Sequence, residues 1–324
     1  MNRILTNVLL TTTLLYVSFG ATAANSETYP VKPVRIVVPA GAGGALDITT
    51  RVVAEKMSEY LGKPITVENR PGGELLVGTR YVLGAKHDGY TLLAQADGFT
   101  AVPSLRNDAG YDPMKDFTGI GLMLRAAQVM YTASGSPFNS AKEYVSMAAA
   151  DPSRLSFAHG GRGSPMHLSG IQFVYKTGLN IIEVPYNGTA AAYPDIAAGR
   201  VDMMFGGYDS GISYIQSKKM KALAVTGDMR LATMPNVPTL KEQGVDLSYY
   251  FWLGLFAPSG TPPQAIQRLS EALQYALKQK DVLERYKTSG AEVVNLSPDQ
   301  FKAFLKNEVS HVENVVDALK IEKK

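Results

Sequence analysis

The sequence predicts an α/β protein made of two similar lobes that face each other across a ligand cleft. Two stretches of the chain repeat one plan, in which a strand enters a glycine-rich loop and is followed by helix, strand, helix and strand. Ligands in open α/β sheets bind beyond the carboxyl ends of the strands. Two such edges in opposition form a cleft. Because no reaction chemistry is evident there, the pattern favours a receptor over an enzyme.

The first plan occupies 35–94 and predicts one lobe. A glycine-rich loop at 40–47 leads into a helix over 48–61, in which Val53, Met57 and Leu61 fall on one face. The following Gly-Lys-Pro ends this helix. The strands that we expect here are 35–39 (RIVVP), 65–68 (ITVE) and 90–94 (YTLLA).

The second plan occupies 155–205 and predicts the other lobe. Its glycine-rich loop covers 159–166, and a helix beginning near 139 precedes it with Ser140 as the N-cap. The strands that we expect here are 155–158 (LSFA), 181–184 (IIEV), 201–205 (VDMMF) and, after the plan, 221–226 (KALAVT).

Two apolar, extended runs connect the lobes in this prediction. The runs 117–133 and 251–257 are long enough to leave one lobe and enter the other. Two crossing strands make a short double hinge, which suits bending of lobe against lobe around a ligand. The predicted division is a signal peptide at 1–23, a first lobe at 24–124 plus 250–324, and a second lobe at 125–249.

The C-terminal region predicts two further helices, which we assign to the first lobe. Each begins at a capping box with proline in the first turn, at 261–264 (TPPQ) and 297–300 (SPDQ).

The N-terminus has the pattern of a secretory signal. A short positive region containing Arg3 precedes an apolar stretch at 8–19 and the small residues 21–23 (ATA), so we expect cleavage after Ala23. The apolar stretch is shorter than the roughly 20 residues that span a bilayer. We therefore expect a protein of the bacterial periplasm.

The composition excludes several classes of function. Without Arg3 the chain has 31 basic and 29 acidic residues, a net charge of +2, which is not the basic footprint of a nucleic-acid binder. The absence of cysteine excludes disulfides, thiolate nucleophiles and cysteine metal sites. We expect a monomer with no cofactor and no metal.

Enzyme motifs are mostly absent. The chain has no P-loop, no G-x-S-x-G elbow and no H-E-x-x-H zinc motif. His159 and His167 flank one loop and could meet Ser164, but the sequence identifies no acidic partner for them. An exported hydrolase that uses Ser164 or Ser210 is therefore the alternative from another functional class.

The glycine-rich loops are the strongest binding candidates. Backbone N–H groups and the helix dipole at 40–47 favour an anion such as a carboxylate, and Gly43 and Gly44 let a ligand approach the backbone. Asp47 is interpreted as the N-cap of that helix. In the second loop Arg162 could bind a carboxylate bidentately or be a solvated loop residue, and His167 could instead bond within its own lobe.

A set of short motifs, ordered along the chain, completes the pattern: 29–33 (YPVKP), 35–39 (RIVVP), 67–72 (VENRPG), 88–93 (DGYTLL), 184–186 (VPY), 199–202 (GRVD), 236–239 (NVPT) and 254–258 (GLFAP). With these motifs the chain resembles the periplasmic receptors of the tripartite tricarboxylate transporter family, also called Bug receptors. The resemblance covers essentially all of the mature chain. It implies a type II periplasmic-binding-protein fold that closes on a small carboxylate, with membrane transporter subunits as partners in some members.

Departures from the family pattern bear on the ligand. The segment 73–76 (GELL) replaces a small amide-rich loop, Gly206 and Gly207 replace Asp-Ser, and Arg162 replaces an asparagine. A small serine- or threonine-rich segment is here 95–97 (QAD). We hypothesise a larger or partly apolar carboxylate, such as an aromatic or longer-chain acid, with Arg162 on its distal anionic end. Alternatively, Glu74 or Asp97 accepts an amine from a zwitterionic ligand.

The sequence thus predicts a non-enzymatic receptor that captures a small organic carboxylate by hinge closure and passes it to a transporter. A sensor for a signalling partner needs the same closure, so the sequence does not decide between a sensor and a transport receptor. The ligand-binding residues that we predict are Ala42, Gly43, Gly44, Ala45, Glu74, Leu75, Gln95, Asp97, Arg162, Ser164, His167, Tyr186, Thr189, Tyr208 and Asp209.

Overall fold

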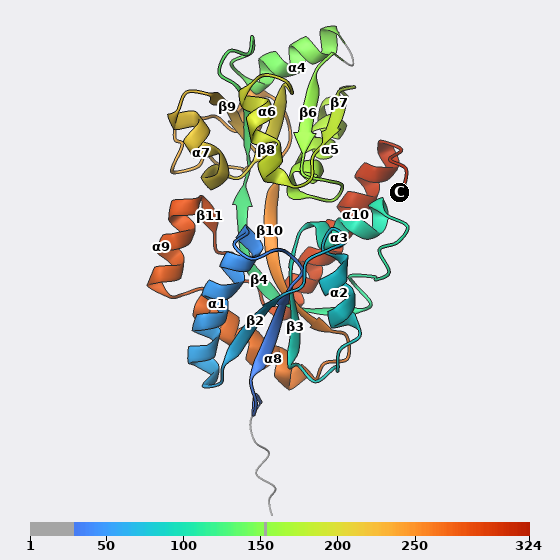
Figure 1. Cartoon of the computed structure of the whole chain (residues 1–324), viewed down its shortest axis with the longest axis vertical. Helices are drawn as coiled ribbons and strands as arrows, with labels where there is room; N and C mark the ends of the chain where they lie inside the picture. The colour runs from blue at the N-terminus through green and yellow to red at the C-terminus, as the bar shows by residue number, and fades with distance from the viewer. Residues whose placement is uncertain (1–28, 152–153) are drawn as a thin grey trace, which may run out of the picture.

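The computed structural model describes residues 29–151 and 154–324, and within these ranges the chain forms two lobes, each built on one β-sheet (Figure 1). The α/β fold with two lobes, as predicted, is therefore confirmed. The predicted signal peptide lies outside the described residues. None of the described helices combines the length and apolar character that a bilayer crossing requires.

Lobe 1 is built on a six-stranded sheet in the order β11-β4-β10-β3-β1-β2, of which β1, β2 and β3 are parallel. Alternate residues of β1 serve opposite faces: Ile36 and Val38 pack with α1 and α8, and Val37 packs with α2, α3 and α10. The elements of this lobe are β1 (Val34–Val38), α1 (Ala45–Leu61), β2 (Ile65–Asn69), α2 (Leu76–Leu83), β3 (Thr91–Ala96), α3 (Gly98–Leu105), β4 (Phe117–Ala127), β10 (Tyr250–Pro258), α8 (Pro263–Ala276), α9 (Lys280–Ser289), β11 (Ala291–Glu292) and α10 (Pro298–Ala318).

Lobe 2 is built on a five-stranded sheet in the order β7-β6-β8-β5-β9. The strand β6 pairs in parallel with β7 and β8, whereas β5 is antiparallel to β8 and β9. The elements are β5 (Val129–Ala133), α4 (Ala141–Ala150), β6 (Ser156–His159), α5 (Pro165–Thr177), β7 (Ile182–Pro185), η1 (Thr189–Ala191), α6 (Tyr193–Ala197), β8 (Met203–Gly206), α7 (Tyr208–Gln216), β9 (Met220–Val225) and η2 (Lys241–Gln243).

Of the helix N-caps predicted from the sequence, those at Ser140 and Ser297 are confirmed and that at Thr261 is wrong. Ser140 and Ser297 cap α4 and α10, and Ser297 forms the full capping box with Gln300. The box expected at Thr261 is not formed, because its hydroxyl donates to the carbonyl of Pro258 (2.8 Å) and Pro262 takes the N-cap position of α8. Helices α3 and α9 were not anticipated.

Two boundaries also differ from the sequence prediction. Helix α1 begins at Ala45, so Gly44 is its N-cap and Asp47, which we interpreted as the cap, lies in the first turn. Strand β3 continues to Ala96 because this residue still pairs with Leu253 of β10. Gln95 therefore lies within the strand instead of after it.

Both crossing segments are hydrogen-bonded to one residue of lobe 2, Thr226. Gln128 alone separates β4 from β5, and Tyr249 directly precedes β10. The Thr226 hydroxyl accepts from the Gln128 amide (2.8 Å) and donates to the Tyr249 carbonyl (2.6 Å). The Thr226 backbone bonds the same two residues, its amide at 2.8 Å from the Gln128 carbonyl and its carbonyl at 2.9 Å from the Tyr249 amide. The hinge is thus held at one point.

Helix α10 provides a third connection between the lobes. Its first turns place Phe301 and Leu305 in the core of lobe 1. Its last turns place Val312, Val315 and Val316 among the buried residues of lobe 2 (Figure 1). Movement of one lobe against the other must therefore also move this helix.

A buried acidic pair lies beside the hinge. Asp97, which is 1 % exposed, accepts hydrogen bonds from the Tyr249 hydroxyl and from the Gly98 amide (2.9 Å). Glu308 of α10 accepts from the Trp252 indole (3.0 Å). Burial raises the pKa of Asp97 to about 7; the Tyr249 hydrogen bond lowers it and the charge of Glu308 raises it. Burial likewise raises the pKa of Glu308.

The raised pKa of Asp97 predicts a pH dependence of stability. Between about pH 4, where an unfolded aspartate ionises, and about pH 7 the folded state binds a proton that the unfolded state has lost. The free energy of unfolding should therefore fall as the pH rises through this window, by up to a few kcal/mol, and the Asp97→Asn variant should lack this decline. Denaturant unfolding of both proteins at a series of pH values measures the difference.

The exposed Asp246→Asn variant is the control, and its unfolding curve should run parallel to that of the wild type. A constant difference between the wild type and Asp97→Asn across pH 4 to 8 would contradict the assignment.

Candidate functional site

Three neighbouring pockets are lined by described residues of both lobes. We name the first the α2 pocket; its volume is about 550 Å³. Lobe 1 contributes 39–41, 71–76, 95–96, the start of α3 and Tyr111, and lobe 2 contributes 160–165 and 187–188. Because both glycine-rich loops line it, the α2 pocket lies where the two strand edges were predicted to face each other.

The second, which we name the α1 pocket, has a volume of about 620 Å³. Lobe 1 lines it with the first turn of α1, the hinge ends of β4 and β10, and part of α9. Lobe 2 lines it with the start of α5, Thr189, Tyr193 and 207–210. Pro165 lines both pockets, so they lie on either side of the start of α5.

The α1 pocket is suited to an anion. Helices α1 and α7 begin here at Gly44 and Gly207, which have no side chain that could cap the first amides. Such amides are unsatisfied donors at the positive end of the helix dipole. In α7, however, the Ser210 amide already donates to the Asp209 carboxylate (2.8 Å), so it is not available to a ligand. Tyr193 also lines this pocket, but its hydroxyl oxygen is enclosed beside Gly206 and does not add a free donor. Donors from both lobes therefore face one space.

Asp47 removes one amide from this set. Its carboxylate accepts from the Gly43 amide (2.9 Å), from Asn69 (2.9 Å) and from Arg51 (3.0 Å). Burial alone would raise the pKa of Asp47, but these hydrogen bonds hold it below its usual value. The Gly43 amide is thus engaged within lobe 1.

The α2 pocket is largely apolar. Leu75, Phe99, Val102 and Tyr111 supply much of its wall. The Gln95 side chain is already engaged, since its amide nitrogen donates to Thr79 (2.8 Å) and its oxygen accepts from the Ala96 amide (3.0 Å). This pocket can therefore enclose a hydrocarbon or aromatic body more readily than a second free charge.

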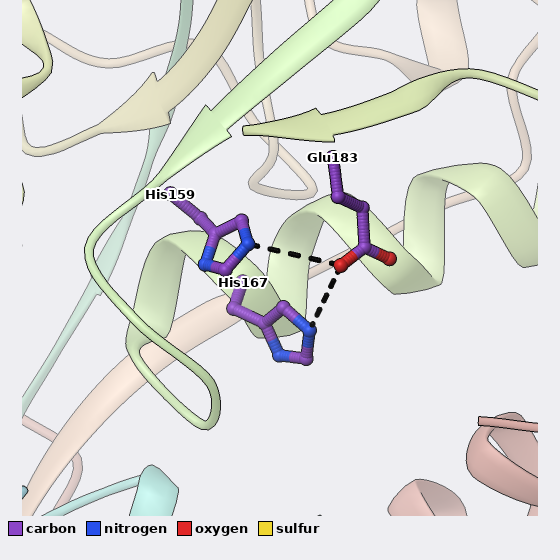
Figure 2. Close-up of side chains that lie close together, drawn as sticks. All are labelled: His159, His167 and Glu183. Carbon is purple, nitrogen blue, oxygen red and sulfur yellow. Dashed lines mark ion pairs between the residues drawn. The ribbon is translucent and has the colours of Figure 1, made fainter. Parts of the chain in front are cut away.

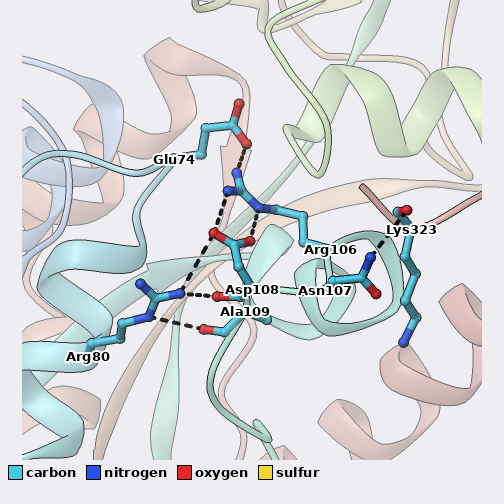
Figure 3. A network of polar contacts seen from close by, with 7 residues as sticks. All are labelled: Glu74, Arg80, Arg106, Asn107, Asp108, Ala109 and Lys323. Atoms are coloured by element: carbon cyan, nitrogen blue, oxygen red, sulfur yellow. Dashed lines mark hydrogen bonds and ion pairs between the residues drawn. The ribbon is translucent and has the colours of Figure 1, made fainter.

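An ion-pair network borders the α2 pocket (Figure 3). Arg106 pairs with Glu74 and with Asp108 (2.8 Å), and Arg80 lies 3.9 Å from Asp108. Glu74 therefore has a cationic partner already, which weakens the hypothesis that it accepts a ligand amine.

Arg162 lies where the α2 pocket adjoins the third pocket, of about 690 Å³, which we name the pocket mouth. The pocket mouth is lined by Glu74, 106–108, 161–162, 185–187 and Lys324. Nη1 of Arg162 donates to the Glu322 carbonyl of the C-terminal tail (2.7 Å). The tail is joined to lobe 1 in turn, since the Lys324 carbonyl accepts from the Asn107 amide (2.9 Å). The guanidinium lines the α2 pocket and has further donors beyond this contact.

The predicted residues divide between these places. Glu74, Leu75, Gln95, Arg162 and Ser164 line the α2 pocket, whereas Gly44, Ala45, Thr189, Tyr208 and Asp209 line the α1 pocket. Tyr186 lines the mouth beside the α2 pocket. Four residues line none of the three pockets: Ala42, Gly43, Asp97 and His167. Asp97 and His167 reach no pocket because both side chains are buried in the interior.

Several lining residues were not predicted. Phe99, Tyr111, Tyr193 and the α9 residues Arg285 and Tyr286 all border the cleft. Phe99 lies two residues after the predicted segment 95–97, so its proximity was accessible from the sequence. The α9 residues come from a helix far along the chain, and only the packing of that helix brings them to the cleft.

The serine and histidine of the second loop do not form a nucleophile and base. The Ser164 hydroxyl caps α5 by accepting from the His167 amide (3.2 Å), and Nδ1 of His167 accepts from the Gly163 amide (3.2 Å). The acidic neighbour that the sequence did not identify is Glu183, at 3.7 Å from both His159 and His167.

Comparison with known proteins identifies a family and relatives that this chain resembles. Residues 49–321 match the sequence profile described as "Tripartite tricarboxylate transporter family receptor". The protein BugT of Bordetella pertussis is 30% identical over 303 residues, which cover 91% of this chain and 92% of BugT.

Solved structures agree with this match. The periplasmic binding protein BugD is 35% identical with a TM-score of 0.79, covering 91% of this chain and all of the BugD chain. An R. palustris protein solved with adipate is 28% identical with a TM-score of 0.81, covering 91% and 100% of the two chains. MatC from Rhodopseudomonas palustris, solved with malate, is 30% identical with a TM-score of 0.78, covering 89% and 100%.

Proposed function

This chain belongs to the tripartite tricarboxylate transporter receptor family, and we propose that it captures a small organic carboxylate in the cleft and delivers it to membrane subunits of such a transporter. The family is one of solute-binding receptors, not of enzymes. The proposed location is the periplasm, after cleavage of the leader near Ala23. Relatives solved with adipate and with malate support a dicarboxylate as the class of ligand.

The observation that most supports this proposal is the pair of helix N-termini facing the α1 pocket. The first amides of α1 belong to lobe 1 and those of α7 to lobe 2, so one carboxylate can accept from both lobes only when they are close together. A ligand that makes more contacts in the closed state shifts the protein toward that state.

The adjoining α2 pocket supports a ligand with a partly apolar body. Phe99, Val102 and Leu75 would contact that body, and Arg162 at the pocket mouth would bind a distal carboxylate. In this arrangement one carboxylate lies at the helix starts and the second lies near the C-terminal tail. The proposed ligand is therefore a longer-chain or aromatic dicarboxylate.

A close contact between Gly98 of lobe 1 and Gly163 of lobe 2 shows how near the two lobes lie to each other. A Cβ atom added to Gly98 of lobe 1 would lie 2.4 Å from the carbonyl oxygen of Gly163 in lobe 2. No side chain fits between these backbones, so the lobes can approach this closely only because residue 98 is glycine.

We first predict a selective thermal shift. The mature protein, refolded to remove carried-over ligand, should melt at a higher temperature with a long-chain or aromatic dicarboxylate than with a short one. At a ligand concentration of about 100 times Kd the stabilisation is about 2.7 kcal/mol. Amino acids and monocarboxylates serve as comparison compounds. Equal melting temperatures with and without every carboxylate would contradict the proposed function.

The second prediction concerns Arg162. The Arg162→Ala variant should lose roughly ten- to a hundredfold affinity for a dicarboxylate, since hydrogen bonds to a charged group contribute about 1.5–3 kcal/mol. The matched monocarboxylate of equal length should lose little, which separates the distal contact from any effect of releasing the Glu322 carbonyl. Isothermal titration calorimetry gives both affinities. An equal loss for the two acids would contradict the assigned role.

The third prediction tests closure. The Gly98→Ala variant should bind its ligand roughly ten- to a hundredfold more weakly, because an overpacked methyl group costs about 1–3 kcal/mol. The melting temperature without ligand should not fall, since alanine favours the α3 helix. Gly84→Ala is the matched control in lobe 1, where the nearest atom to the new Cβ would be 3.8 Å away. Equal affinities of the two variants would exclude a steric role for Gly98.

A further inference from the structure

Three side chains of lobe 2 converge beneath the second glycine-rich loop (Figure 2). His159 ends β6, His167 lies in the first turn of α5, and Glu183 lies on β7. Nε2 of each histidine is 3.7 Å from Oε2 of Glu183, and the three potential ligand atoms lie within 4.8 Å of one another. Each residue comes from a different element of lobe 2.

Strand register explains this convergence. Glu183 pairs with Phe157 in the parallel β6–β7 ladder, and His159 follows Phe157 by two residues, so all three side chains belong to one face of the sheet. Phe157 packs with α5 in the core of lobe 2 on that face. The first turn of α5 brings His167 to the same place, with the two imidazole centroids 4.7 Å apart.

The two imidazoles are buried without full hydrogen bonding. His159 and His167 are 2 % and 0 % exposed, respectively. Nδ1 of His159 and Nε2 of His167 have no hydrogen-bond partner among the described residues. Unpaired buried polar atoms are costly and few in folded proteins. The Glu183 side chain is 40% exposed, so one side of the cluster is open to solvent.

We propose that His159, His167 and Glu183 form a binding site for a divalent transition-metal ion of the zinc class, with water as a fourth ligand. Two imidazoles and one carboxylate are a ligand set that zinc accepts with an open position. Imidazole nitrogen selects against magnesium and calcium, which prefer oxygen ligands. Neither the receptor family nor the cleft requires this ion, and the cluster lines none of the three pockets.

Metal binds neutral imidazole and ionised carboxylate, so the affinity of this site for zinc should fall as the pH is lowered.

Small movements complete the site. With bonds of about 2.0–2.1 Å, the ligand atoms of a tetrahedral zinc site lie roughly 3.3 Å apart. The two 3.7 Å separations must shorten slightly, and the imidazole nitrogens, which lie within 4.8 Å of each other, must also come to this distance. Metal binding through Nε2 of His167 leaves the proton on Nδ1, and the Gly163 amide that now donates to Nδ1 must turn away. Gly161 and Gly163 have φ values of +107° and +75°, and glycine has the freedom for such a change.

This change would connect the ion to the cleft. Residues 160–164 line the α2 pocket, so an ion that reorients the Gly163 amide alters one wall of that pocket. Any effect of the ion on ligand affinity must then be matched by an equal effect of ligand on ion affinity.

The test is calorimetric titration of zinc chloride into the untagged, chelator-treated mature protein. We expect one ion per chain. The Glu183→Gln variant should bind at least about tenfold more weakly, since loss of even an outer-sphere partner costs 10- to 100-fold. Glu183 is partly exposed, so this variant should keep its fold, which the melting temperature checks. The His159→Asn variant should show a similar loss.

The His87→Ala variant is the control, because His87 is exposed and stands outside the cluster. It should bind zinc as the wild type does. Cobalt(II) gives an independent readout, since a tetrahedral site with nitrogen ligands produces visible absorption that Glu183→Gln should reduce. The proposal is overturned by the absence of saturable binding, or by equal zinc affinity of the wild type, Glu183→Gln and His159→Asn.

Discussion

The four hydrogen bonds of Thr226 are the constraint on which the arrangement of the lobes depends. They hold Gln128 and Tyr249, the residues at which the two crossing segments enter and leave lobe 2. Because both segments are joined to the same residue, the lobes can rotate about this point but cannot separate there. The cleft opens on one side of this point, and α10 spans the lobes as a further connection. This geometry allows the hinge closure that the proposed function requires.

The chemistry of the cleft follows from how its polar side chains are already used. Gln95, Glu74 and Asp47 all have partners within lobe 1, so they add little free charge to the pockets. The donors left over are amides at the starts of α1 and α7 and the guanidinium of Arg162. The one carboxylate among the described residues that line the α1 pocket, that of Asp209, is bonded to the Ser210 amide. The remaining donors favour an anionic ligand. The apolar wall of the α2 pocket then discriminates among anions by the shape of their hydrocarbon part.

The sequence predicted several features that depend on neighbours in the chain, although the caps expected at Thr261 and Asp47 were wrong, and it failed where pairing across the sheet decides. The caps at Ser140 and Ser297 are local, and both are confirmed. The placement of Gln95 depends on β10, which extends β3 to Ala96 and turns the amide inward. Glu183 was missed as a partner of the histidines because only the register of β6 against β7 brings it near them.

The loop at 160–164 shows how one short segment can connect several properties. Its residues line the α2 pocket. The Gly163 carbonyl faces Gly98 of lobe 1 across the cleft, and the Gly163 amide donates to Nδ1 of His167 within lobe 2. A peptide group cannot change its amide partner without reorienting its plane. An ion bound by His167 would therefore also change the surface that meets lobe 1. A Cβ atom at position 163 would lie 2.9 Å from Cγ2 of Val102, and φ there is +75°, so both the available space and the backbone conformation favour glycine.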